Sequence, residues 1–216
     1  MGHNFRTPLT AVKASVSTLR SAEGQLKASQ RAELLENIQD EADRLERLID
    51  KVLAVSRVRA GGLCPERRLV DFPGLVGAIM RRLEPVRGDR RFCIRTPEGL
   101  APVRVDVVMM EQVLLNLLEN ALRHAPPRSE VWVQMERLGS CLELRVVDSG
   151  RGVAPEHREQ VFEEFFQAQL RRDGLGTGLG LNIVKGLVKA HGGGAWCEET
   201  PGGGATFVIN MPAWPE

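Results

Sequence analysis

The 216-residue chain contains no tyrosine, and aromatic residues make up only 5% of it. Modules that bind single-stranded nucleic acid stack bases on aromatic side chains, so this scarcity argues against such a module. Lys and Arg number 29 against 28 Asp and Glu, which leaves a formal charge of +1. Neither nucleic acid nor an anionic membrane surface is therefore indicated as a partner.

Long apolar runs and cysteine pairs are also missing. No run approaches the roughly 18–20 apolar residues that span a bilayer, and the N-terminus lacks the apolar stretch of a signal peptide. Cys64, Cys93, Cys141 and Cys197 are widely spaced, and none forms a C-x-x-C pair. We expect free thiols in a reducing cytosol rather than a zinc site or a disulfide framework. The composition that remains, 43% hydrophobic and 26% charged, is typical of a folded globular protein.

The first 60 residues have helical periodicity and no strand pattern. Apolar residues recur at helical spacing over residues 7–20, where Pro8 is compatible with a helix start but would kink a helix interior. Over residues 30–59 an apolar heptad pattern predicts a second, longer amphipathic helix. Two such helices cannot bury their apolar faces alone. We therefore expect a helical hairpin that pairs with a second copy, as half of a four-helix bundle.

A linker with paired glycines and a proline, at residues 61–68, separates this hairpin from a region of different composition. Beyond it we predict an α+β sandwich, in which helices cover one face of a mixed sheet. Expected strands lie at residues 69–72, 91–95, 103–105, 130–137, 141–148, 195–198 and 205–209, and expected helices at 73–83, 107–124 and 179–191. The predicted domains are a hairpin at 1–60 and a second domain at 69–216.

Three stretches of this second domain carry candidate chemistry. In NLLENALRHA, Asn116 and Asn120 lie one helical turn apart, which suits a hydrated metal–phosphate group; two exposed helix amides are the alternative. In DSGRGVAP, Asp148 ends a strand and is a candidate acceptor for an exocyclic amine such as that of adenine, unless the stretch is a plain turn. In GLGTGLGLNIV, alternating glycines run into a helix and leave N–H groups available to phosphates, unless they form a flexible hinge.

Taken together in this order, the stretches resemble the N, G1 and G2 boxes of a known nucleotide-binding fold. Sensor histidine kinases share that fold with DNA gyrase, a heat-shock chaperone family and the MutL mismatch-repair proteins. VFEEFF at residues 161–166 resembles the intervening F box, and HNFRTPLT at residues 3–10 resembles the phosphoacceptor H box. SRVRAGGL and NLLENA are most similar to the potassium-responsive Kdp-type sensors. The resemblance implies a Bergerat-type ATP-binding domain that follows a phosphoacceptor hairpin, and it covers nearly the whole chain.

The resemblance also implies roles for individual residues. His3 would take a phosphoryl group from ATP and pass it to an aspartate on the receiver domain of a response regulator. Asn116 and Asn120 would hold Mg²⁺ on the ATP phosphates, with Arg123 where the family usually has lysine. The remaining nucleotide site would consist of Asp148, Gly150 and Gly152 at the adenine and of Gly176, Thr177, Gly178 and Gly180 at the phosphates. An amide at position 116 cannot act as a base, which favours a kinase over a hydrolytic ATPase.

Two departures from the family pattern affect the expected activity. Asn4 follows the phosphoacceptor where Glu or Asp is usual, and with Thr7 it forms N-x-x-T in place of the usual phosphatase motif. The alternative function is therefore an ATP-binding signalling module with weak autokinase activity and a bias towards phosphatase activity. The chain also begins just before His3, so we expect a fragment with a shortened first helix and a weakened homodimer. By this resemblance it is a cytoplasmic core that reaches the membrane only through absent N-terminal regions.

Overall fold

The computed structural model describes residues 2–22, 26–59, 63–166 and 178–213. The chain divides into two compact units. The first, here called the hairpin unit, is built around the first two helices, and the second, called the sheet unit, contains all the strands. No helix in the described ranges combines the length and the apolar character that crossing a membrane requires.

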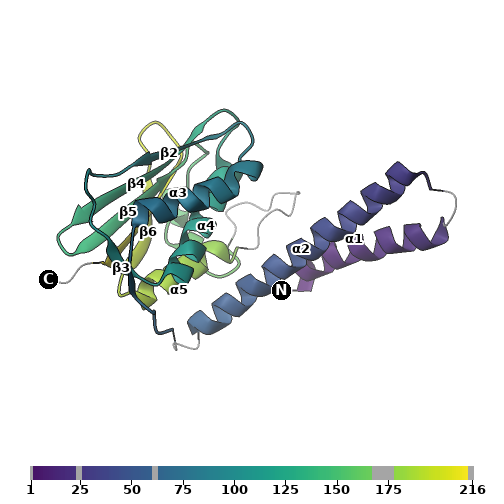
Figure 1. The fold of residues 1–216 in the computed structure, drawn as a ribbon, viewed down its shortest axis with the longest axis horizontal. Coiled ribbons are helices and arrows are strands. Elements are labelled where there is room, and N and C mark those ends of the chain that lie inside the picture. Colours follow the sequence, from purple (N-terminus) through teal and green to yellow (C-terminus); the bar gives the residue numbers. More distant parts are fainter. Residues whose placement is uncertain (1, 23–25, 60–62, 167–177, 214–216) are drawn as a thin grey trace. The chain divides into compact units, whose positions relative to one another are not determined.

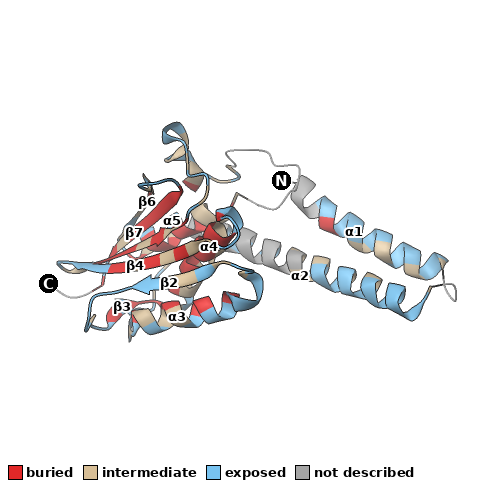
Figure 2. Ribbon diagram, turned by 90° about the horizontal axis from the view of Figure 1, so that it is seen from above, coloured by how far each residue is buried: buried red, intermediate tan, exposed pale blue. Residues whose placement is uncertain are grey.

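The hairpin unit contains α1 (Gly2–Ser21) and α2 (Ala28–Arg59) up to Ala54, and both helices are shown in Figure 1. α1 begins at Gly2, so Pro8 lies inside the helix and not at its start. Proline there removes one N–H group from the helix ladder, which would otherwise bond to the carbonyl of Asn4. Among the described side chains of α1 and α2, Pro8 is buried and all others are half-buried or exposed (Figure 2).

The sheet unit contains a five-stranded sheet in the order β2-β4-β5-β7-β6 and a two-stranded sheet of β1 and β3. β2 runs parallel to β4, and the other neighbouring strands are antiparallel. The strands are β1 (Arg68–Val70), β2 (Arg91–Arg95), β3 (Val103–Val105), β4 (Glu130–Leu138), β5 (Cys141–Val147), β6 (Gly194–Glu199) and β7 (Ala205–Pro212). The predicted mixed sheet is therefore confirmed.

Three helices, α3 (Phe72–Leu83), α4 (Val107–His124) and α5 (Gly180–Ala190), cover one face of the larger sheet (Figures 1 and 2). Three short 3₁₀ helices are η1 (Glu84–Val86), η2 (Pro155–His157) and η3 (Gln160–Phe162). The apolar stripe of α4, which includes Leu114 and Leu117, is fully buried. The amphipathic pattern of the sequence thus becomes the contact between helix and sheet.

Capping residues set two of the helix starts. Asp106 accepts a hydrogen bond from the N–H of Met109 at 3.1 Å and begins α4 where it was predicted. Asp71 accepts a hydrogen bond from the N–H of Gly74 at 3.2 Å and begins α3. A strand was predicted to run to residue 72, but β1 ends at Val70, because Asp71 already belongs to the helix cap.

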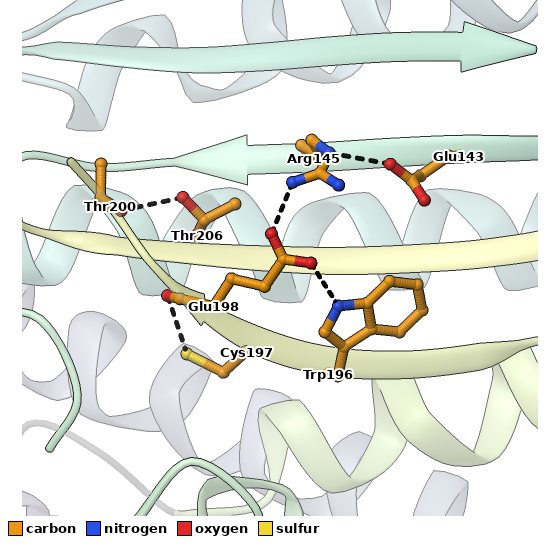
Figure 3. A network of polar contacts seen from close by, with 7 residues as sticks. All are labelled: Glu143, Arg145, Trp196, Cys197, Glu198, Thr200 and Thr206. Atoms are coloured by element: carbon orange, nitrogen blue, oxygen red, sulfur yellow. Dashed lines mark hydrogen bonds and ion pairs between the residues drawn. The ribbon is translucent and has the colours of Figure 1, made fainter. Parts of the chain in front are cut away.

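The other face of the larger sheet carries a polar network (Figure 3). Leu144 is fully buried in the core, so its neighbour Arg145 points to the opposite face. Arg145 donates to Glu143 at 2.8 Å and to Glu198 at 2.6 Å, and the Trp196 indole N–H also donates to Glu198 at 2.6 Å. These bonds link β5 to the edge strand β6 across β7.

Candidate functional site

The N-box and G2-box stretches meet where α4 packs against the start of α5. Asn116 on α4 is 6% exposed, and its Nδ2 donates to the carbonyl of Gln112 at 2.8 Å. Its Oδ1 lies close to Gly180, because a Cβ atom on that glycine would lie only 2.9 Å from this oxygen. Glycine at position 180 therefore permits the contact. Asn120, one turn further along α4, is half-buried.

Asp148 follows β5 and has an exposed fraction of 2%. Its Oδ1 accepts hydrogen bonds from the N–H groups of Gly150 at 2.8 Å and of Ala205 at 3.4 Å. Its Oδ2 is buried, and no donor among the described residues reaches it. Burial raises the pKa of the Asp148 carboxyl, and the two backbone hydrogen bonds oppose this in part. A buried acceptor of this kind fits a ligand that brings its own donor.

Glycines allow other backbone segments to approach this carboxylate. A Cβ on Gly150 would lie 2.8 Å from the carbonyl oxygen of His124 at the end of α4. Gly152 has a φ of +74°, and a Cβ there would lie 2.7 Å from the carbonyl oxygen of Gly204. Gly204 and Ala205 were not among the predicted site residues. The signal that would have identified them is the run of three glycines directly before β7.

The F-box stretch lies beside Gly178. The carbonyl of Gly178 accepts a hydrogen bond from the N–H of Phe165 at 2.9 Å, and a Cβ on Gly178 would lie 2.6 Å from the Phe165 carbonyl carbon. Both residues have positive φ, +67° and +62° respectively, and such a value is unusual for phenylalanine. Gly176 and Thr177 lie outside the described residues, so the roles predicted for them stay predictions.

The other predicted residues are distributed over both units. Arg123 is exposed in the last turn of α4. His3 and Asn4 lie at the start of α1, and their side chains are outside what the structure describes. Thr7 is exposed on the same helix. The phosphoacceptor motif thus belongs to the hairpin unit and the nucleotide motifs to the sheet unit.

A buried histidine links the C-terminal end of α5 to the N-terminal end of α4. Both of these helix ends lie away from the nucleotide motifs. His191 is fully buried, its Nδ1 lies 2.8 Å from the Leu187 carbonyl oxygen, and its Nε2 accepts the Asp106 N–H at 3.1 Å. A carbonyl can only accept, so we assign the proton to Nδ1 and treat the ring as neutral. Asp106 also accepts the N–H of Glu66 at 2.9 Å, and Arg67 donates to the His191 carbonyl at 3.0 Å. The network fastens the C-terminal part of the linker to α4 and α5.

Comparisons with known proteins identify both units. Residues 105–215 match the family model described as "Histidine kinase-, DNA gyrase B-, and HSP90-like ATPase", and residues 1–61 match "His Kinase A (phospho-acceptor) domain". The sensor protein KdpD of Mycobacterium tuberculosis H37Rv is 34% identical over 220 residues, which cover 99% of this chain and 25% of KdpD. KdpD of Escherichia coli K12 is 32% identical over 215 residues, which cover 98% of this chain and 24% of KdpD.

Among solved structures, full-length ShkA in complex with AMPPNP is similar, with 29% identity and a TM-score of 0.76 over 99% of this chain and 45% of ShkA. The chain spans about a quarter of the length of the KdpD proteins that it matches. The matches confirm the predicted resemblance, including its lean towards Kdp-type sensors, and do not favour the alternative of a weak autokinase. The chain therefore belongs to the histidine kinases, as a two-component sensor kinase core in which a phosphoacceptor domain precedes an ATP-binding domain.

Proposed function

We propose that Asp148 accepts a hydrogen bond from the exocyclic amine of the ATP adenine. The observation that carries this proposal is its buried Oδ2, which no described donor reaches. An ionised carboxylate only accepts hydrogen bonds, and the adenine amine donates them, so the bound base would satisfy the oxygen that the protein leaves unpaired. Gly150 and Gly152 would shape the turn at the base, because a side chain at either would meet neighbouring backbone.

The ATP phosphates would lie at the start of α5. The first N–H groups of a helix have no partner within the helix, and the helix dipole adds positive charge there, which together favour a phosphate. We assign Gly178 and Gly180 to the phosphate site, and with them Gly176 and Thr177, which lie outside the described residues. Arg123, exposed in the last turn of α4, is a further cation for the phosphates.

The Mg²⁺ ion that accompanies ATP would be held from α4. Asn116 places its Oδ1 beside Gly180, and an amide oxygen is a suitable ligand for this hard cation. Asn120, one turn away, is the second ligand in this proposal. When bound, Mg²⁺ neutralises charge on the phosphate oxygens. Protein sites for Mg²⁺ commonly offer only one or two ligands and share the ion with substrate phosphates.

His3 would be the nucleophile in this reaction. A ring nitrogen of His3 attacks the γ-phosphorus, the bond from that phosphorus to the bridging oxygen of ADP breaks, and the imidazole loses a proton. Asn116 offers no basic group to activate water in competition. Asn4 can accept a hydrogen bond from the His3 ring but carries no charge, so it stabilises the cationic ring less than a carboxylate would. Asn4 and Thr7 would position water for a separate phosphatase reaction, in which water and not ADP takes the phosphoryl group.

The proposed partner is the receiver domain of a response regulator, whose aspartate takes the phosphoryl group from His3. The hairpin unit is proposed to form a homodimer through its apolar faces, as a four-helix bundle. We further propose that the full-length protein is anchored in the cytoplasmic membrane, as a sensor of which this chain is one part.

Incubation with γ-labelled ATP tests the reaction. We expect acid-labile label on the protein, and none on a His3→Gln variant that keeps its ADP affinity. The matched control is His157→Gln on η2, which should label as the parent does. Release of free phosphate without protein label would instead identify an ATPase. Asn120→Ala should weaken only the Mg²⁺-dependent part of nucleotide binding, as measured by calorimetry with and without the ion.

A further inference from the structure

Asn182 is the third residue of α5, and its side chain does not cap its own helix. Asparagine near a helix start commonly bonds to neighbouring backbone N–H groups. Here the side-chain Nδ2 donates to the carbonyl oxygen of Phe162 at 3.1 Å, from a position 20 residues further along the chain. The N-cap residue of α5, Leu179, offers no side-chain cap either. Neither of these two side chains therefore caps the amide N–H groups at the start of α5.

Phe162 is a fixed point for this hydrogen bond. It ends η3, is 3% exposed, and packs edge-on against Phe207 of β7, with ring centroids 6.2 Å apart and an interplanar angle of 75°. Phe207 is equally buried, and β7 lies inside the five-stranded sheet. The carbonyl that accepts from Asn182 is thus held by the core of the sheet unit.

A second hydrogen bond joins the same two segments on the other side of the N-cap. The N–H of Phe165 donates to the carbonyl of Gly178 at 2.9 Å. Residues 162–165 and 178–182 therefore lie side by side, tied by one backbone bond and one side-chain bond. The side-chain bond is the one that a substitution can remove.

The start of α5 has a fixed neighbour on the α4 side as well. Oδ1 of Asn116 lies against Gly180, so the first turn of α5 is confined between α4 and the tethered segment that carries Phe162. Without the Asn182 bond, this turn would be tied to the segment that carries Phe162 only by the backbone bond at Gly178. Hydrogen bonds from its N–H groups weaken steeply when their angle changes.

We propose that Asn182 is a positioning residue for the nucleotide phosphates. Through the Phe162 carbonyl it fixes the first turn of α5, so that the amides of that turn are directed at the phosphates. The proposal rests on the proposed function, in which the phosphates bind at the start of α5. It assigns Asn182 no contact with the adenine, which binds at Asp148.

Calorimetry with ADP, and competition binding with adenosine, test this in the whole chain. Asn182→Leu keeps the size of the side chain and removes its donor, whereas Asn182→Gln keeps an amide donor on a longer arm. We expect Asn182→Leu to lose ADP affinity by about tenfold at most, as one neutral hydrogen bond supports, and to keep adenosine affinity. Asn182→Gln should recover part of the ADP affinity. Asn37→Leu, on the exposed face of α2, is the matched control and should change neither affinity.

The ATP dependence of autophosphorylation distinguishes a positioning role of Asn182 from a merely structural one. In Asn182→Leu the ATP concentration for half-maximal labelling should rise, while the rate at saturating ATP is kept. Unchanged ADP affinity in Asn182→Leu, or an equal loss of ADP and adenosine affinity, would overturn the proposal. If the parent chain bound neither ligand, the proposed function itself would fail, which is a different outcome from the failure of Asn182 alone.

Discussion

The two units differ in how far they bury their apolar side chains. In the sheet unit, Phe72, Leu117 and Ile183 have no exposed surface. In the hairpin unit, Leu35 is 52% exposed and Leu9 is 45% exposed. Burial of apolar surface is the main favourable contribution to folding, at about 25 cal/mol per Å². The sheet unit therefore contains its own core, whereas we expect the hairpin unit to gain much of its stability from a second copy.

The units also differ in what they leave incomplete. The hairpin unit exposes an apolar face, which another protein chain would have to cover. In the sheet unit, the buried Oδ2 of Asp148 has no donor among the described residues, so a small ligand is needed to supply one. Each unit thus departs from the rule of complete burial and complete hydrogen bonding at the place where its partner is proposed to bind.

The largest expected effect concerns the sheet unit alone. Asp148→Asn should weaken ADP binding by at least about a hundredfold, because an amide N–H would face the adenine amine where an acceptor is needed. The ligand-free stability should not fall. A carboxyl with a raised pKa costs stability as the pH rises above its ordinary value, and the substitution removes that cost. Calorimetry gives the affinity and thermal unfolding gives the stability.

Either of two results would contradict this prediction. ADP affinity equal to that of the parent would place the base elsewhere. A marked drop in the ligand-free unfolding temperature would show that the Asp148 carboxylate stabilises the fold and is not kept for a ligand.

A pair of leucine substitutions compares the two units directly. Leu117→Ala removes a fully buried side chain and should lower the free energy of unfolding of the sheet unit by about 2–5 kcal/mol at any protein concentration. Leu35→Ala should have an effect that grows with protein concentration, since its side chain would be buried only in a dimer. Urea unfolding at two protein concentrations measures both. A concentration-independent loss in Leu35→Ala would contradict the proposed role of the second copy.

Local signals account for the parts of the fold that could be predicted from the sequence. The ends of α4 were predicted correctly because Asp106 caps its start and apolar periodicity runs through it. The start of α1 was not located by apolar periodicity, which was traced only from residue 7, whereas α1 begins at Gly2. Element ends depend on such single residues and are therefore the least certain part of the prediction.

The candidate site was predicted as motifs but not as contacts. Asp148, Asn116 and Gly180 were named from local patterns in three separate stretches, and the resemblance to known boxes then joined those stretches into one site. That Asn116 touches Gly180, and that Ala205 donates to Asp148, follows only from how distant segments pack. No periodicity carries that information, and the same holds for the bond from Asn182 to Phe162.

A smaller effect is expected from acid. Burial lowers the pKa of His191, and the hydrogen bond to the Leu187 carbonyl opposes this in part. A buried histidine with a lowered pKa makes its full contribution to the free energy of unfolding above about pH 6.5, its ordinary pKa. Stability falls as the pH drops below that value, because the unfolded chain then binds the proton more readily. The slope should reach at most about 1.4 kcal/mol per pH unit in the sheet unit.

Urea unfolding between pH 5 and pH 8 measures this slope. His191→Gln should unfold more easily than the parent at neutral pH and show a flatter pH dependence, while His157→Gln should behave as the parent does. The charged groups that act on this imidazole are Arg67 and Asp106. An unchanged acid slope in His191→Gln would mean that other groups account for it.

The smallest expected changes in stability come from single polar contacts, one in each unit. Asp71→Ala removes the cap of α3 and should cost the sheet unit about 1 kcal/mol. Gln39→Ala removes an exposed hydrogen bond to Asp43 on α2, at 2.9 Å, which contributes only about 0.2–0.5 kcal/mol. Because alanine has the higher helix propensity, it offsets that loss, and the net change in the hairpin unit should be close to zero. Circular dichroism during urea unfolding distinguishes the two outcomes. A cost for Gln39→Ala as large as that for Asp71→Ala would show that the polar face of α2 is not merely solvated.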